Sequence, residues 1–211
     1  MREEDLISMV RPQVLGNYSH PIQTLDICRA VQHLEGDFCE CGVAYGAISA
    51  LMANFIKENN LNKFMFMADS FQGIPYPTEN DDMFPNGLPL PKTGELKSSG
   101  VSVSPLGDVL NRFSSWKVST DNIKIFEGWL ENTIDDLTKS IDKLSFLRID
   151  VDLYRPTKLC LDYLGPKVVK GGVILIHDLM PGCYKAVNEY IADKGLVIQE
   201  QPDYGGILLQ I

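Results

Sequence analysis

Two apolar, β-branched runs that end at carboxylates place the strongest constraint on the fold of this chain. They are residues 147–152 (LRIDVD) and 172–178 (GVILIHD), and the segment between them is predicted to be a helix. A β-α-β unit of this kind brings its two strands side by side and parallel. The side chains at the strand ends then converge at one sheet edge, where ligands bind in open α/β sheets. These side chains are Asp150, Asp152, His177 and Asp178, and together they indicate a metal and a reaction.

The rest of the chain continues the alternation of strands and helices. Further strands are predicted at residues 38–42, 64–68 and 123–126, and helices at residues 22–34, 46–58 and 183–194. Residues 196–198 and 207–211 are predicted to close the fold as a β-hairpin through Asp203-Tyr204-Gly205-Gly206. We therefore expect an α/β, Rossmann-like fold: a mostly parallel seven-stranded sheet with helices on both faces and a C-terminal antiparallel hairpin. It should form one domain over residues 1–211, with residues 1–35 as an N-terminal helical cap.

Composition and charge exclude several classes of partner. The chain has 211 residues, 45% hydrophobic residues and a net charge of −9. This negative charge argues against binding to the negatively charged backbone of a nucleic acid. No apolar stretch reaches the roughly eighteen residues that span a bilayer, and the acidic N-terminus does not resemble a signal peptide. Cysteines lie at positions 28, 39, 41 and 160 in apolar stretches, which is typical of reduced core residues. We expect a cytoplasmic enzyme that binds neither nucleic acid nor membrane.

Residues 74–105 interrupt the regular pattern. Their first part carries five prolines, at positions 75, 77, 85, 89 and 91, and shows almost no periodicity. A loop of this length inside a compact domain is uncommon and is usually functional or disordered. We interpret it as a lid or substrate-facing loop, with a plain disordered excursion as the alternative.

The turn after the first strand separates two classes of cofactor. Residues 40–46 read E-x-G-x-x-x-G, whereas a dinucleotide site requires G-x-G-x-x-G to hold a pyrophosphate. The carboxylate of Glu40 suits a cationic ligand with an amino group, and S-adenosylmethionine has both a sulfonium and an α-amino group. A strand-to-helix turn needs glycine in any case, so a purely structural role for Gly42 stays open.

The next two strand ends fit the same cofactor. Asp69 follows the second strand, where an acidic residue can accept hydrogen bonds from ribose hydroxyls, and Ser70 and Phe71 add a hydroxyl and an apolar wall. The third strand ends at Gly128 and Trp129, which could hold an adenine ring. A solvated Asp69 and a core Trp129 are the alternatives.

Taken together, these segments resemble the macrocin O-methyltransferase (TylF) family, S-adenosylmethionine- and metal-dependent enzymes that methylate sugar hydroxyls. The resemblance covers most of residues 36–190 in the right order. It runs through GDFCECGV (36–43), DSFQGIP (69–75), EGWLENTI (127–134), LRIDVDLY (147–154) and GG…HD with PGCYKAV behind it (171–187). The combination of D-S-F-x-G-[IL]-P with D-x-D-L-Y is specific, and it implies the class I methyltransferase fold.

The resemblance implies a role for each matching residue. Glu40 and Gly42 would hold the methionine end of the cofactor, Asp69 its ribose, and Gly128, Trp129 and Leu130 its adenine. The further cofactor-binding residues would be Tyr45, Gly46, Ser70 and Phe71. Asp150, His177 and Asp178 would hold a divalent metal, Mg or Mn, and Asp152 would be the general base. A homodimer and a sugar acceptor with a vicinal diol are also implied.

One position departs from the family, whose fifth strand normally ends in two aspartates. Here it ends in His177-Asp178, and imidazole is a good ligand for manganese, iron or zinc but a poor one for magnesium. Either the site takes a softer metal, or His177 turns aside and the metal is weak or absent. The N-terminal segment matches the family poorly, and Tyr18, Ser19 and His20 are candidate substrate contacts that the resemblance does not support.

The D-x-D motif at residues 150–152 supports a mechanistic hypothesis and also an alternative to it. Asp152 lies two residues along the predicted strand from Asp150, so the two should share one face as base and ligand. The same D-x-D is a signature of metal-dependent glycosyltransferases that hold a nucleotide sugar. A methyltransferase of catechol-like acceptors and a non-catalytic binding module are two further hypotheses.

Overall fold

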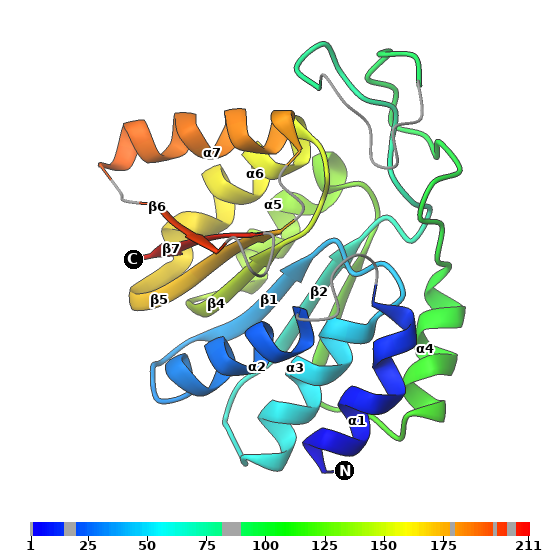
Figure 1. Ribbon diagram of the computed structural model, residues 1–211, viewed down its shortest axis with the longest axis vertical. Helices are drawn as coiled ribbons and strands as arrows, with labels where there is room; N and C mark the ends of the chain where they lie inside the picture. The colour runs from blue at the N-terminus through cyan, green and yellow to red at the C-terminus, as the bar shows by residue number, and fades with distance from the viewer. Residues whose placement is uncertain (1, 15–19, 82–89, 178–179, 196–197, 202–205) are drawn as a thin grey trace.

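The computed structural model describes residues 2–14, 20–81, 90–177, 180–195, 198–201 and 206–211. In these residues a seven-stranded sheet has the order β3-β2-β1-β4-β5-β7-β6, with helices on both faces (Figure 1). The strands are β1 Asp37–Cys41, β2 Met65–Asp69, β3 Ile123–Glu127, β4 Leu144–Ile149, β5 Val168–His177, β6 Ile198–Gln201 and β7 Gly206–Gln210. The first five strands pair in parallel, and β7 joins both β5 and β6 antiparallel.

The helices form a layer on each side of the sheet. On one face lie α1 Glu3–Val10, α2 His20–Val31, α3 Ala47–Glu58 and α4 Leu106–Ser115, and on the other α5 Leu130–Ser140, α6 Tyr154–Leu164 and α7 Pro181–Lys194 (Figure 1). Short 3₁₀ turns follow α1 (Arg11–Gln13) and α6 (Gly165–Lys167). Each face buries its own hydrophobic cluster. Because the parallel strands are covered on both faces, they are apolar almost throughout, as expected for such a sheet.

Helix α3 shows how local sequence fits this packing. Every residue from Ala47 to Ile56 is buried, so this stretch is covered on all sides and fills the space between α1, α2 and the sheet. Gly46 precedes it in a left-handed conformation with φ +84°. A Cβ there would lie 2.6 Å from Val109 and 2.7 Å from Phe113, so only glycine allows α4 to pack this closely.

The sheet order reverses between β1 and β4, which is the topological switch point where α/β sheets bind ligands. Cys41 pairs with Ile149 at this point, and the Asp150 N–H donates to the Cys41 carbonyl at 2.8 Å. Gly42 has φ +85°, and a Cβ on it would lie 1.8 Å from the Asp150 carbonyl oxygen. Only glycine can therefore connect β1 to the next helix beside the end of β4.

The predicted architecture is confirmed, with differences at several boundaries. The mostly parallel sheet, the C-terminal hairpin and the helix between β4 and β5 are present. Two helices, α4 and α5, were not assigned from the sequence. The expected strand over residues 147–152 starts earlier and stops at Ile149, so Asp150 and Asp152 lie in a loop. The turn of the hairpin at residues 203–205 is outside the described residues.

The five cysteines are all buried and free of disulfides, as predicted for the four that were interpreted as core residues. No helix in the described part of the chain has the length and apolarity to cross a lipid bilayer.

Most of the predicted loop over residues 74–105 is described and has no regular secondary structure. Its two arms run antiparallel: Ile74 N–H bonds to the Val101 carbonyl at 2.9 Å, and Ser99 N–H to the Ile74 carbonyl at 3.0 Å. We call residues 74–81 and 90–103 the cover segment. It extends beyond the carboxyl ends of the strands and is coloured teal to green in Figure 1.

Candidate active site

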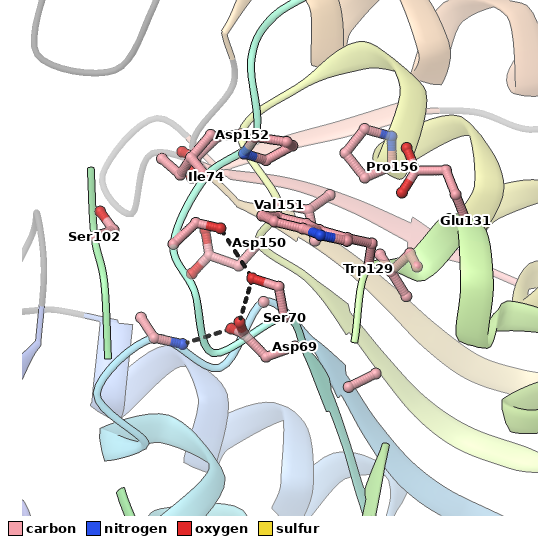
Figure 2. A pocket seen from close by; sticks show the side chains of 16 residues that line it. Asp69, Ser70, Ile74, Ser102, Trp129, Glu131, Asp150, Val151, Asp152 and Pro156 are labelled. Carbon is pink, nitrogen blue, oxygen red and sulfur yellow. Dashed lines mark hydrogen bonds between the residues drawn. The ribbon is translucent and has the colours of Figure 1, made fainter. Parts of the chain in front are cut away.

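Two neighbouring cavities lie at the carboxyl ends of the parallel strands. The first has about 580 Å³ of empty space, including space open to solvent, and the second about 510 Å³. They share Gly42, Ala44, Ser102, Asp150 and Asp152. The first lies between the ends of β2, β3 and β4 and the cover segment, whereas the second reaches the N-terminal segment. Figure 2 shows the first cavity, with Asp69, Trp129, Asp150 and Asp152 around it.

Asp69, the predicted ribose ligand, organises the turn after β1. One carboxylate oxygen accepts backbone N–H bonds from Val43 at 2.6 Å and Ala44 at 3.0 Å, and the other accepts one from Phe71 at 2.7 Å. Burial raises the pKa of Asp69, and these backbone donors oppose the rise. The Ser70 hydroxyl is a fourth donor, at 3.5 Å from the second oxygen, and a ligand hydroxyl would take the place of this long bond. Because Asp69 is the last residue of β2 and its carboxylate is held by these donors, the alternative of a solvated loop aspartate is wrong.

The backbone around this turn is held in uncommon conformations. Ala44 and Phe71 have positive φ values of 47° and 54°, which cost free energy for residues other than glycine and are common at functional sites. The Phe71 side chain is buried and does not line either cavity; its backbone supports Asp69 instead. Ser70 lines the first cavity and donates to the Gly73 carbonyl at 3.0 Å.

Trp129 follows β3 and lines the first cavity together with Leu130. Gly128 turns the chain between them and the strand with φ +142°, and its N–H bonds to the Asp69 carbonyl at 2.9 Å. Trp129 is half-buried at the start of α5, so the alternative of a core tryptophan is wrong. Its side chain and that of Asp69 line the same cavity (Figure 2).

Glu40 is part of a buried charge network that the sequence did not indicate. Arg148, which is 1% exposed in β4, lies 2.6 Å from Glu40 Oε1 and 2.8 Å from Asp150 Oδ2. Ser49 donates to the other oxygen of Glu40. Burial raises the pKa of Glu40 to about 7, against the opposing effect of Arg148. Glu40 lines the second cavity with Gly42 and Tyr45, while its carboxylate pairs with the Arg148 guanidinium.

Asp150 and Asp152 line both cavities, although not for the reason the sequence indicated. Because β4 ends at Ile149, the two are not brought together by strand alternation, and that part of the prediction is wrong. Asp152 adopts a left-handed conformation with φ +62°, which aspartate tolerates better than most residues. This turn of the backbone, between β4 and α6, gives both carboxylates access to the cavities.

His177 is buried at the end of β5 and is absent from the lining of both cavities. Its Nδ1 lies 3.8 Å from Asp150 Oδ1, and its ring packs edge-on against His20 at 3.6 Å between centroids. His20, the guessed substrate contact, lines the second cavity. Asp178, Tyr18 and Ser19 are outside the described residues.

The donor set can be tested against the implied divalent metal. Asp150 Oδ1 and His177 Nδ1 are 3.8 Å apart, a separation that two ligands of one ion can span with bonds of about 2.0–2.2 Å. Arg148 neutralises the other oxygen of Asp150. Within the described residues no group of three His, Cys, Asp or Glu side chains is arranged to hold a metal. The two described donors fit an ion, and a complete site needs a third ligand beyond them.

Some predicted residues support the site and other residues were missed. Gly46 and Gly128 shape turns and do not line the cavities. The polar residues that line them without having been predicted as site residues are Gln13, Ser102, Glu131 and Arg148. Of these four, Arg148 could have been recognised from the sequence, because a charged residue inside an otherwise apolar strand requires a buried partner.

Comparisons with known proteins agree with this geometry. The family model described as macrocin O-methyltransferase (TylF) matches residues 7–201. Demethyldecarbamoylnovobiocin O-methyltransferase of Streptomyces niveus is 32% identical over 82% of this chain and 66% of that protein. Mycinamicin III 3''-O-methyltransferase of Micromonospora griseorubida is 28% identical over 93% of this chain and 77% of that protein. The solved structure of the O-methyltransferase NovP superposes with a TM-score of 0.76 at 27% identity, covering 99% of this chain and 88% of that one.

Proposed function

The chain belongs to the macrocin O-methyltransferase (TylF) family, and from this premise we propose that it transfers the methyl group of S-adenosylmethionine to a sugar hydroxyl of a glycosylated metabolite. Two of its relatives are named for the O-methylation of a novobiocin precursor and of a mycinamicin. The observation that carries the proposal is one cavity that combines Asp69 and Trp129 with Asp150 and Asp152.

The cofactor would bind across both cavities. Asp69 would accept hydrogen bonds from the ribose hydroxyls, Trp129 and Leu130 would contact the adenine, and Glu40 would pair with the α-amino group in the second cavity. Gly42 and Ala44 line both cavities, so the sulfonium would lie near them. Asp150 and Asp152 line both as well, which supports placing the reacting methyl group beside these two carboxylates.

Methyl transfer requires the acceptor oxygen, the methyl carbon and the sulfur to be nearly collinear. A sugar hydroxyl is a weak nucleophile because its pKa lies far above neutral, so the enzyme has to orient it and remove its proton. We assign Asp152 as the general base. Arg148 lies 2.8 Å from one oxygen of Asp150 and holds that carboxylate in place, and Asp150 would hold the adjacent hydroxyl of the acceptor.

The divalent metal remains part of the proposal. Asp150 and His177 are the described residues that would bind it, and Asp178 is the further candidate. When bound, an ion would supply positive charge that favours the alkoxide form of a chelated diol. We expect titration with MnCl2 to detect binding more readily than MgCl2, because imidazole favours manganese. No binding of either ion at millimolar concentration would remove the metal from the proposal.

The test of the function is a methylation assay with S-adenosylmethionine and a panel of glycosylated and catechol-like acceptors. We expect a mass gain of one methyl group on a sugar. Methylation of the catechols alone would instead support the catechol hypothesis. Calorimetric titration with S-adenosylmethionine and with a nucleotide sugar separates methyl transfer from glycosyl transfer, since only one of the two should bind.

A homodimer, which the family resemblance implies, and a cytoplasmic location, which is expected from reduced core cysteines, are further proposals. Light scattering on the purified chain tests the first, and fractionation of the source cells tests the second.

A further inference from the structure

Asp81 lies at the end of the first arm of the cover segment, and its carboxylate is buried at 3% exposure. Oδ2 accepts hydrogen bonds from the backbone N–H of Thr78 at 2.9 Å and from its hydroxyl at 2.8 Å. Oδ1 accepts from the backbone N–H of Tyr154 at 2.8 Å. One side chain therefore connects the cover segment to the start of α6.

The hydrogen bond from Tyr154 to Asp81 lies at the N-terminus of α6. Tyr154 is the first residue of α6, and its N-cap residue, Leu153, makes no side-chain cap. The first N–H groups of a helix lack partners within it and require an acceptor from elsewhere. Asp81 supplies that acceptor, and its carboxylate lies at the positive end of the helix dipole, where a negative group is stabilising.

The residue two positions before Tyr154 is Asp152, the assigned base. Asp152 has φ +62°, a conformation that persists only when its surroundings hold it. On one side the Asp150 N–H is bonded to Cys41 of β1, and on the other Tyr154 is bonded to Asp81. The loop 150–153 is thus fixed at both ends, and the second anchor comes from a segment about seventy residues away in the chain.

Packing strengthens the same connection. Leu153, 2% exposed, forms a small apolar cluster with Ile74, Leu90 and Val101 of the cover segment. Space around Asp81 is tight, since a Cβ on Gly182 at the start of α7 would lie 2.3 Å from Asp81 Oδ1. Asn80 next to it accepts a hydrogen bond from Lys185 of α7 at 2.6 Å. The cover segment is therefore docked on the starts of both α6 and α7.

We propose that Asp81 is a positioning residue for methyl transfer: its bond to the Tyr154 N–H holds the loop 150–153 so that Asp152 faces the acceptor. The inference rests on the proposed function, because it assumes that Asp152 removes the acceptor proton. It assigns Asp81 no contact with the cofactor, the acceptor or the reacting atoms.

The test compares Asp81→Ala with Asp81→Asn and with the control Thr78→Val. Alanine removes both sets of hydrogen bonds, and we expect kcat to fall about 10–100-fold while the affinity for S-adenosylhomocysteine changes less than twofold. Asparagine keeps an oxygen that can accept from Tyr154, so it should recover most of kcat. Thr78→Val removes the hydroxyl bond to Oδ2 and the bond that this hydroxyl accepts from the Asn80 N–H at 3.3 Å. It leaves the bond between Asp81 and Tyr154 in place and should keep kcat close to that of the wild type.

Amide hydrogen exchange supplies a measurement that does not depend on activity. In Asp81→Ala we expect faster exchange in residues 150–157 and unchanged exchange in residues 40–46. Unchanged exchange in residues 150–157 would overturn the inference, as would faster exchange with kcat within threefold of the wild type. Equal loss of cofactor affinity in all three variants would also overturn it. If the wild type methylates no sugar, the proposed function fails, and the exchange data still decide whether Asp81 holds the loop.

Discussion

Asp69 and Asp150 line the same cavity and are held in different ways. Asp69 accepts hydrogen bonds from three backbone N–H groups, those of Val43, Ala44 and Phe71. Asp150 pairs with the side chains of Arg148 and His177. On the proposed cofactor side, Asp69 is thus held by the backbone, although Glu40 there pairs with the side chains of Arg148 and Ser49. On the proposed catalytic side, Asp150 depends on individual side chains. Substitutions should therefore damage the catalytic side more selectively.

The largest expected effect comes from Asp152→Asn, which leaves the cofactor side intact. Loss of a general base typically costs a factor of about 10²–10⁴ in rate, and we expect kcat to fall in that range. Calorimetry should show S-adenosylmethionine binding as tightly as in the wild type. An equal loss of cofactor affinity would remove Asp152 from the catalytic role and would erase the distinction between the two sides.

The next effect concerns Arg148, the residue that links the two sides. Arg148→Met leaves the buried Glu40 without its ion pair and removes the partner of Asp150, and breaking a buried ion pair costs about 3–5 kcal/mol. Urea unfolding should report a loss of that size. The double variant Arg148→Met, Glu40→Gln should recover part of it. A loss below about 1 kcal/mol would mean that the two carboxylates find new partners.

Trp129→Ala tests the part of the cofactor side that a side chain supplies. Stacking of a base on an aromatic ring is worth about 1–3 kcal/mol, so affinity for S-adenosylhomocysteine should fall about 10–100-fold. The rate at saturating cofactor should stay close to that of the wild type, and Trp129→Phe should bind better than the alanine variant. Unchanged affinity in Trp129→Ala would place the adenine elsewhere.

The smallest expected effect is a pH dependence of cofactor binding through Glu40. Burial raises the pKa of Glu40 to about 7, so the carboxyl is mostly neutral at pH 6 and mostly ionised at pH 7.5. Only the ionised form attracts the α-ammonium group, and affinity for S-adenosylhomocysteine should therefore rise about tenfold over that interval. Glu40→Gln should bind weakly at both pH values. A pH-independent affinity in the wild type would show that Glu40 does not meet the ammonium group.

The same contrast explains what could be predicted from the sequence. Glu40, Gly42, Asp69 and Trp129 lie at or directly after strand ends, and parallel strands bring their carboxyl ends to one edge, so local pattern was enough to place them. Local pattern did not reveal the order of the strands or the helices α4 and α5. Helix α5 (Leu130–Ser140) buries Leu130, Ile134 and Leu137. Their i, i+4, i+7 spacing is that of an amphipathic helix, so this helix could have been assigned and was missed.

The catalytic side was harder to predict because its contacts join distant residues. Arg148 meets Glu40 across 108 positions of the chain and Asp81 meets Tyr154 across 73. Neither pair has a local signature. The expectation that strand alternation aligns Asp150 with Asp152 was wrong because β4 ends at Ile149 and a left-handed residue follows.

The burial of the five thiols allows the opening of the folded chain to be measured by cysteine labelling. Since none of Cys28, Cys39, Cys41, Cys160 and Cys183 is accessible in the folded chain, a maleimide reagent should label only molecules that have opened. The rate of labelling then measures how often the folded chain of the wild type, or of each variant, opens to expose its cysteines. A cysteine introduced at an exposed position such as Lys139, whose side chain is 75% exposed, would be a unique attachment point for a fluorophore.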